Sequence, residues 1–141
     1  MDRVVIDTNV LVGAMLRRTG DNRQVIRACL EGRLTPLIGE ALFLEYEGVL
    51  NRGELFRSSP LSRDERRELF AAFLSMCEWV HVYFLWRPNL PDEADNHVVE
   101  LAIAGSAAMI VTGNVRHFRA SELCFRGLRI VTSRELVREL G

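Results

Sequence analysis

Short apolar runs alternate along the chain with segments in which apolar residues recur every three or four positions. The runs are typical of buried strands, and the recurring pattern is typical of helices that pack on one face. Strands are predicted at residues 3–6, 34–38, 80–84, 109–112 and 128–131. Helices are predicted at residues 9–17, 21–33, 40–51, 62–77, 94–105 and 133–140.

Three local signals refine the ends of these elements. Asp21 is expected to cap the second helix, because its carboxylate can accept hydrogen bonds from the first turn. Ser62 and Glu65 have the spacing of a capping box, which predicts a helix start at this point. Pro36 lacks a backbone N–H, and we therefore expect a bulge or a strand end within residues 34–38.

The alternation of strands and helices predicts the fold class. It favours an α/β domain with three layers, α/β/α, around a central and mainly parallel sheet of about five strands. The length of 141 residues fits a single domain over residues 1–141, and no repeat or linker interrupts it. Sites in such folds lie beyond the carboxyl ends of the strands. Asp7 and the turn at residues 112–114 occupy such positions.

Composition indicates where in the cell the protein is expected and which kinds of site it lacks. The net charge is −1, which gives no overall basic signal for nucleic acid, although all 18 basic residues are arginine and suit phosphate contacts. The three cysteines lack the spacing of a disulfide framework or a zinc site. No apolar run approaches the length of a signal peptide core or a membrane span. We therefore expect a cytoplasmic protein without a membrane segment.

Two carboxylates stand where apolar packing is expected. Asp7 follows three apolar residues without a break, although a helix cap would also explain it. Glu45 lies beside Leu42, Tyr46 and Val49 on its helix, on or next to the face that must pack inward. A salt-bridged or snorkelling residue at the boundary of the core is the alternative for Glu45.

A third carboxylate begins the predicted helix at residues 94–105. Asp95 shares a helix face with the apolar residues Val98, Val99 and Ala102. Asp92 lies just upstream and could serve the helix N-terminus, where negative charge is favoured. Capping is the alternative explanation for either residue, and the helical register favours Asp95 as the site residue.

Clustered carboxylates repel one another, and a divalent cation removes that conflict. Hard oxygen ligands select Mg²⁺ or Mn²⁺ over zinc, and such ions support phosphodiester hydrolysis by an activated water. His81, His97 and His117 are isolated in the sequence and are interpreted as surface or satisfied residues. No nucleophile elbow, Walker loop or dinucleotide-binding glycine motif is present.

Four segments, taken in order, resemble the motifs of the PIN domain family. Residues 4–11 (VVIDTNVL) resemble an apolar strand followed by D-T-N-[IV]-[LW], and residues 44–50 (LEYEGVL) resemble the second motif with its helical Glu. Residues 91–96 (PDEADN) with 99–102 (VELA) resemble the third motif, and residues 110–114 (IVTGN) the fourth. Order and spacing match along nearly the whole chain. The likeness is strongest to bacterial PIN proteins that are toxins of toxin–antitoxin pairs, akin to VapC toxins.

The resemblance implies a ribonuclease that depends on Mg²⁺ or Mn²⁺. It implies that Asp7, Glu45 and Asp95 bind the metal and carry the catalysis. It also implies a homodimer and a small antitoxin protein as a partner. Accessory positions, on the loops after the first and fourth strands, are Thr8, Asn9, Thr112 and Asn114.

The fourth motif departs from the family pattern. A further Asp is common either at the position of Asn114 or three residues later, where this chain has His117. The side chain of Asn114 offers an amide oxygen, which carries no charge. Whether the site binds one metal ion or two therefore stays open. Asp92 is a possible compensation for the missing acid.

Arginines near the predicted strand ends are candidates for RNA contacts, and ordinary solvated side chains are the alternative for each. They are Arg17, Arg18, Arg116 and Arg119. The cluster at residues 63–67 alternates with acids and is interpreted as a solvated helix face.

The sequence therefore predicts a metal-dependent endoribonuclease that hydrolyses RNA phosphodiester bonds and is the toxin of a toxin–antitoxin pair. Two alternatives stay open. One is a housekeeping nuclease that processes RNA or DNA, since the same residues would serve it. The other is a catalytically weakened PIN domain that acts as a binding module, which the missing fourth acid supports weakly.

Overall fold

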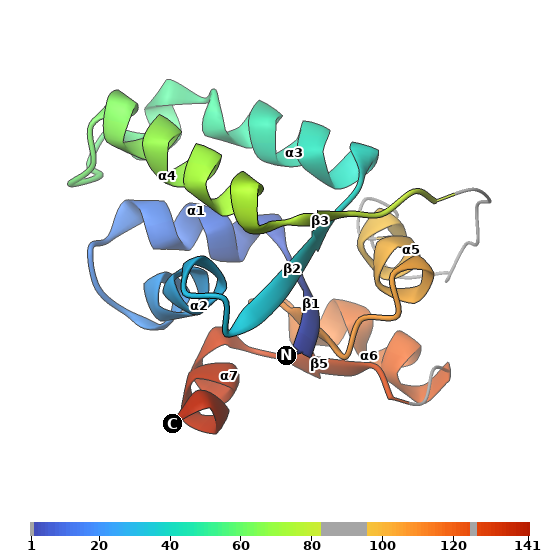
Figure 1. Cartoon of the computed structure of the whole chain (residues 1–141). Helices are drawn as coiled ribbons and strands as arrows, with labels where there is room; N and C mark the ends of the chain where they lie inside the picture. Colours follow the sequence, from blue (N-terminus) through green and yellow to red (C-terminus); the bar gives the residue numbers. More distant parts are fainter. Residues whose placement is uncertain (1, 83–95, 125–126) are drawn as a thin grey trace.

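The computed structural model describes residues 2–82, 96–124 and 127–141 of the chain (Figure 1). The strands are β1 (Asp2–Ile6), β2 (Leu34–Ile38), β3 (Glu78–Trp79), β4 (Met109–Val111) and β5 (Arg129–Val131). The helices are α1 (Thr8–Leu16), α2 (Asp21–Leu30), α3 (Glu40–Leu50), η1 (Gly53–Phe56), α4 (Arg63–Met76), α5 (Asn96–Ala104), α6 (Val115–Cys124) and α7 (Ser133–Leu140).

The five strands form one sheet in the order β3-β2-β1-β4-β5, and every neighbouring pair is parallel. Strand β1 is central, and its residues Val4, Val5 and Ile6 are fully buried. The chain moves from β1 through β2 to β3, then crosses back to β4 on the other side of β1. The switch point of the topology therefore lies between the carboxyl ends of β1 and β4.

Helices cover both faces of the sheet, as the predicted three-layer α/β/α class requires. Helices α1 to α4 lie on one face and α5 and α6 on the other, while α7 packs against α2 (Figure 1). The central strands β1 and β4 are buried on both sides, which explains why Val4 to Ile6 and Met109 to Val111 appear in the sequence as continuous apolar runs. The described helices include none that is both long enough and apolar enough to span a bilayer.

Several predicted element ends differ from the structure. Strand β3 pairs with β2 at Glu78 and Trp79, ahead of the apolar run at residues 80–84, whose last two residues lie outside the described ranges. Gly20, rather than Asp21, is the N-cap residue of α2, and Asp21 is the first helical residue. Pro36 was expected to mark a bulge or a strand end, and the strand end is wrong, because β2 continues to Ile38. In β2, Leu34 to Pro36 pair with β1, and Leu37 and Ile38 pair with β3. The missing N–H of Pro36 therefore lies at the boundary between these two pairings.

Two elements were not predicted. Helix α6 follows β4 in a segment where few apolar residues recur at helical spacing, and η1 is a single short turn. The predicted capping box is confirmed, because Ser62 accepts from the Glu65 N–H while the Glu65 side chain accepts from the Ser62 N–H. It fixes the start of α4.

Candidate active site

Asp7 is the first residue beyond β1 and the N-cap of α1. Its backbone N–H donates to Val111 O at 2.9 Å, which continues the pairing of β1 with β4. Its carboxylate is buried with 5% exposure, and Oδ1 accepts from the Thr8 N–H at 2.9 Å. Asp7 is therefore a helix cap, and it also lies at the switch point of the sheet.

The loop after β4 closes on Asp7 from the neighbouring strand. Thr112 Oγ1 donates to Asp7 Oδ2 at 2.7 Å, and Asn9 Nδ2 donates to the same oxygen at 3.1 Å. The Gly113 N–H in turn donates to Asn9 Oδ1 at 3.1 Å, and the Asn114 N–H donates to Thr112 Oγ1 at 3.0 Å. These contacts bring the predicted first and fourth motifs together and hold the Asp7 carboxylate in one orientation.

Glu45 reaches the same place from α3. Thr8 Oγ1 donates to Glu45 Oε2 at 2.6 Å, so Thr8 is bonded to Glu45 through its side chain and to Asp7 through its backbone. The next residue, Tyr46, is fully buried, and its hydroxyl donates to Ile6 O at the end of β1. That bond ties α3 to the strand that carries Asp7, and it sets the position of Glu45.

His97 on α5 is a site residue that sequence reasoning missed. Its Nε2 lies 3.4 Å from Glu45 Oε2. Hydrogen bonds from His97 and then Thr8, together with the charge of His97, lower the pKa of Glu45 against the opposing effect of burial. The carboxylate is thus kept ionised. No signal in the sequence reveals this contact, because it depends on how α5 lies beside α3.

The third predicted carboxylate, Asp95, lies outside the described residues, and so does Asp92. Helix α5 begins at the next residue, Asn96, which is buried with 3% exposure. Within the described ranges, three or more His, Cys, Asp or Glu residues do not come together in a way that could hold a metal ion. The described acids of the site are Asp7 and Glu45.

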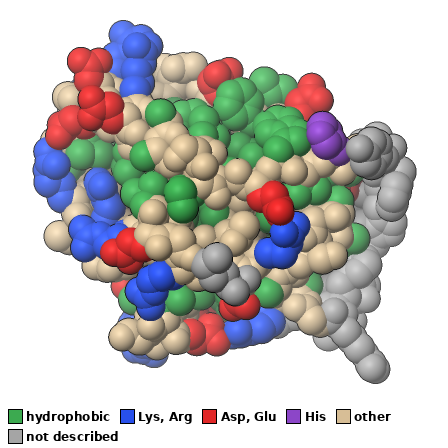
Figure 2. All heavy atoms as spheres, viewed as in Figure 1, with side chains coloured by type: hydrophobic (Ala, Val, Ile, Leu, Met, Phe, Trp, Pro, Cys, Tyr) green, Lys and Arg blue, Asp and Glu red, His purple; other side chains and the backbone are tan. Residues whose placement is uncertain are grey.

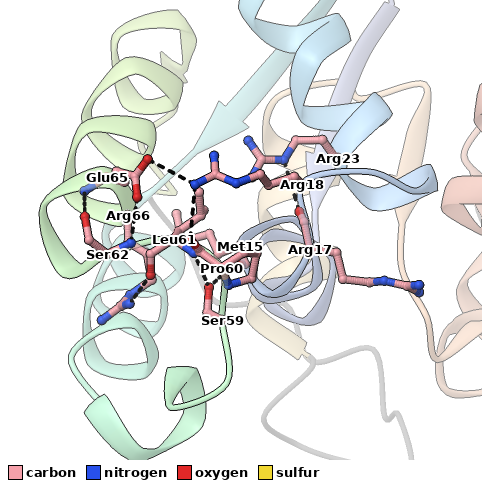
Figure 3. Close-up of polar contacts among 10 residues, drawn as sticks. All are labelled: Met15, Arg17, Arg18, Arg23, Ser59, Pro60, Leu61, Ser62, Glu65 and Arg66. Carbon is pink, nitrogen blue, oxygen red and sulfur yellow. Dashed lines mark hydrogen bonds and ion pairs between the residues drawn. The ribbon is translucent and has the colours of Figure 1, made fainter.

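The candidate RNA-binding arginines occupy two places. Arg17 and Arg18 follow the last turn of α1, at the end of that helix opposite Asp7. Arg18 donates to Pro60 O at 3.1 Å and pairs with Glu65 at 3.3 Å (Figure 3). Arg116 and Arg119 are exposed on α6, which starts just beyond the carboxyl end of β4. Of the two pairs, Arg116 and Arg119 are therefore the arginines that lie at the edge of the sheet where the predicted motifs meet.

A cavity of about 470 Å³ adjoins the site through His97. Its walls come from the first turns of α3, from residues 79–82 and from α5, where Glu100 lies one helical turn after His97. Leu44, Trp79 and Val82 are large apolar residues on this surface, with 56%, 47% and 38% exposure. Figure 2 shows apolar side chains gathered over this part of the molecule, with a histidine at their edge.

Fold and site together define a class of protein, a parallel α/β domain with acidic residues at the switch point of its sheet. The family model described as PIN domain matches residues 3–116, and the chain therefore belongs to the PIN domain family.

The fold of the chain is also similar to that of a solved structure. A chain of the crystal structure of VapBC2 from Rickettsia felis bound to a DNA fragment from their promoter matches with a TM-score of 0.58 and 15% identity. The match covers 92% of this chain and 98% of that chain, and at this identity it concerns the fold. A comparison with curated proteins gives no match.

Proposed function

We propose that this protein is a metal-dependent endoribonuclease and the toxin of a toxin–antitoxin pair. The observation that carries the proposal is the pairing of Asp7 and Glu45 through Thr8 at the switch point of the sheet. Two carboxylates held together at a site lined by polar loops repel each other when both are ionised, and this repulsion favours a cation between them. Membership of the PIN domain family supports a nuclease.

The donors at this site suit a hard divalent cation. Asp7 and Glu45 offer carboxylate oxygens, and Thr112 and Asn114 add further oxygen atoms nearby. Mg²⁺ and Mn²⁺ prefer such oxygen ligands. We propose that Asp7, Glu45 and Asp95 would hold the ion, which when bound would activate a water and stabilise charge on the scissile phosphate.

The other residues of the site have positioning roles. Asn9 and Thr112 fix the orientation of Asp7, and Thr8 fixes Glu45 relative to it. His97 keeps Glu45 ionised. A charged Glu45 is the form that binds a cation, so these contacts prepare the site before the ion arrives. The attacking group is a water, and no protein nucleophile is required.

The biological setting is proposed from the comparisons. The similar structure from Rickettsia felis is named as a VapBC2 complex on promoter DNA. A small antitoxin protein is the corresponding partner proposed for this chain, together with a homodimer in the cytoplasm. The exposed apolar residues beside the site are suited to a protein contact.

Calorimetric titration with Mn²⁺ tests the metal-binding part of the proposal. Glu45→Gln should weaken Mn²⁺ binding by about tenfold or more, because a charged ligand becomes neutral. Glu40→Gln is the matched control, since Glu40 is exposed on the same helix and its side chain makes no hydrogen bond or ion pair within the described ranges. Equal Mn²⁺ affinity in the wild type and Glu45→Gln would remove Glu45 from the ligand set.

A further inference from the structure

Helix α4 separates its charges between two faces. Arg63, Arg66 and Arg67 fall within an arc of about 100° around the helix axis, given 3.6 residues per turn. Asp64, Glu65 and Glu68 lie on the other side. The alternation of charges in the sequence therefore does not produce a mixed surface, and the interpretation of this segment as an evenly solvated helix face is incomplete.

The acidic face already has a structural role. Glu65 completes the capping box with Ser62 and pairs with Arg18 on the loop after α1. Figure 3 shows Glu65 turned toward Arg18, while Arg66 reaches back to Leu61. Arg63 and Arg67 make no ion pair or hydrogen bond with any residue in the described ranges.

The arginine face borders a cavity of about 550 Å³ between α4 and the end of α3. Arg66 is held in place, because its Nη1 donates to Leu61 O at 3.0 Å and its guanidinium lies 4.7 Å from the centre of the Phe56 ring. Phe70 provides an apolar wall, and Glu47 is the one acid among the residues that line this cavity in the described part of the chain. The lining carries three positive charges against one negative charge.

Placing Arg63 here has a cost for the helix. It is the first helical residue of α4, at the positive end of the helix dipole, where a cation is unfavourable. Asp64 and Glu65 follow in the same first turn and offset the dipole, but the Arg63 guanidinium itself makes no ion pair or hydrogen bond within the described ranges. A ligand with negative charge would neutralise the three guanidinium groups that line the cavity.

We propose that the α3–α4 cavity binds the phosphate backbone of single-stranded RNA, an inference that rests on the proposed ribonuclease function. The whole protein has a net charge of −1 and does not attract a polyanion by its overall charge. A local row of arginines is the means by which such a protein holds RNA.

The cavity is separate from the catalytic site. Two of its lining residues, Glu47 on α3 and the C-cap residue Asn51, face away from Glu45, which is bonded to Thr8. Asn51 lies about 9 Å along the helix axis from Glu45, at 1.5 Å per residue. The cavity therefore adds affinity for RNA that extends beyond the site, without touching the scissile phosphate.

Fluorescence anisotropy with a labelled oligouridylate in chelator measures this affinity in the absence of cleavage. Arg63→Gln/Arg67→Gln should weaken binding by about tenfold, the size expected for two lost exposed ion pairs. The slope of log affinity against log salt should decrease in magnitude by about 1.4, at about 0.7 for each phosphate contact of a single strand. Glu47→Gln should tighten binding, because it removes the opposing charge.

Arg134→Gln/Arg138→Gln is the matched control, since it removes two exposed charges from α7 at a distant part of the surface. It should leave affinity and salt slope unchanged. Thermal melts must show that both double variants are folded, and single Arg67→Gln replaces the first if it is not. An identical slope in wild type and Arg63→Gln/Arg67→Gln would overturn the inference. Stronger competition by polyglutamate than by unlabelled RNA would also overturn it and assign the cavity to an acidic protein.

Metal-dependent cleavage by the wild type is measured in parallel on the same RNA. Cleavage with an unchanged salt slope in Arg63→Gln/Arg67→Gln overturns the cavity assignment and leaves the ribonuclease proposal standing. A reduced salt slope without any cleavage supports the cavity assignment and contradicts the ribonuclease proposal.

Discussion

Thr8 connects the two described acids of the site, through its backbone to Asp7 and through its hydroxyl to Glu45. We expect Thr8→Val to lower the cleavage rate by roughly 10- to 100-fold, the usual effect of losing a group that orients metal ligands. The change is close to isosteric, so the backbone bond to Asp7 stays in place. Cleavage of labelled RNA under metal saturation measures the effect.

Thr8→Ser restores the hydroxyl and is the control for this prediction. It should recover most of the activity lost in Thr8→Val. Mn²⁺ affinity provides a second measurement, which a general loss of stability would not change in a folded protein. Wild-type cleavage and Mn²⁺ affinity in Thr8→Val would show that the hydroxyl does not organise Glu45.

The residues of the site differ in how far the sequence reveals them. Asp7 and Glu45 could be placed beforehand, because each interrupts an apolar pattern at the end of a strand or beside a core face. The contact of His97 with Glu45 could not be predicted, because it joins two helices whose relative position no local sequence pattern encodes. The roles of Asp95 and Asp92 stay predictions, because both residues lie outside the described ranges.

At the scale of elements, close packing fixes α5 against the sheet just where the helix ends. A methyl group on Gly105 would lie 2.6 Å from Leu37 Cδ1 and 3.1 Å from Val80 Cγ2. Gly105→Ala should therefore destabilise the protein by about 1–3 kcal/mol, and it should lower activity by displacing the helix that carries His97. Denaturant unfolding measures the first effect.

Gly48→Ala is the matched control in an open part of α3. A methyl group there meets no atom within 4 Å, and alanine in a helix is favoured over glycine by roughly 0.5–1 kcal/mol. We expect a small gain in stability and unchanged cleavage. A Gly105→Ala protein as stable as the wild type would show that Leu37 and Val80 adjust without cost.

Strands were predicted most accurately where both faces of the strand are buried. The strands β1, β2 and β4 were found at or within one residue of their observed ends, because each contains a short run of buried apolar residues. Strand β3 was predicted two residues late, since the edge strand begins at two exposed residues, Glu78 and Trp79. Val80, the first residue of the predicted run, continues the pairing through its N–H to Ile38 O. Helix α6 lacks a strong apolar period and was not found.

At the scale of the whole molecule, the exposed apolar residues beside the site predict association. Leu44 is 56% exposed, and Leu44→Arg should shift the proposed homodimer toward monomer, because it buries a charge in the contact. Light scattering after size-exclusion chromatography gives the mass directly. Leu55→Arg is the control, since Leu55 is 42% exposed on η1, away from this surface. A dimer that tolerates Leu44→Arg would place the interface elsewhere.

The measurement that tests the central claim most directly is cleavage of a mixed single-stranded RNA with Mn²⁺, Mg²⁺ or chelator. The wild type, Asp7→Asn, Asp95→Asn and Asp92→Asn are compared, with thermal melts to confirm folding. We predict metal-dependent cleavage that is lost in Asp7→Asn and Asp95→Asn and retained in Asp92→Asn. Cleavage by Asp7→Asn at the wild-type rate, or equal cleavage in chelator, would contradict a metal-dependent site built on the end of β1.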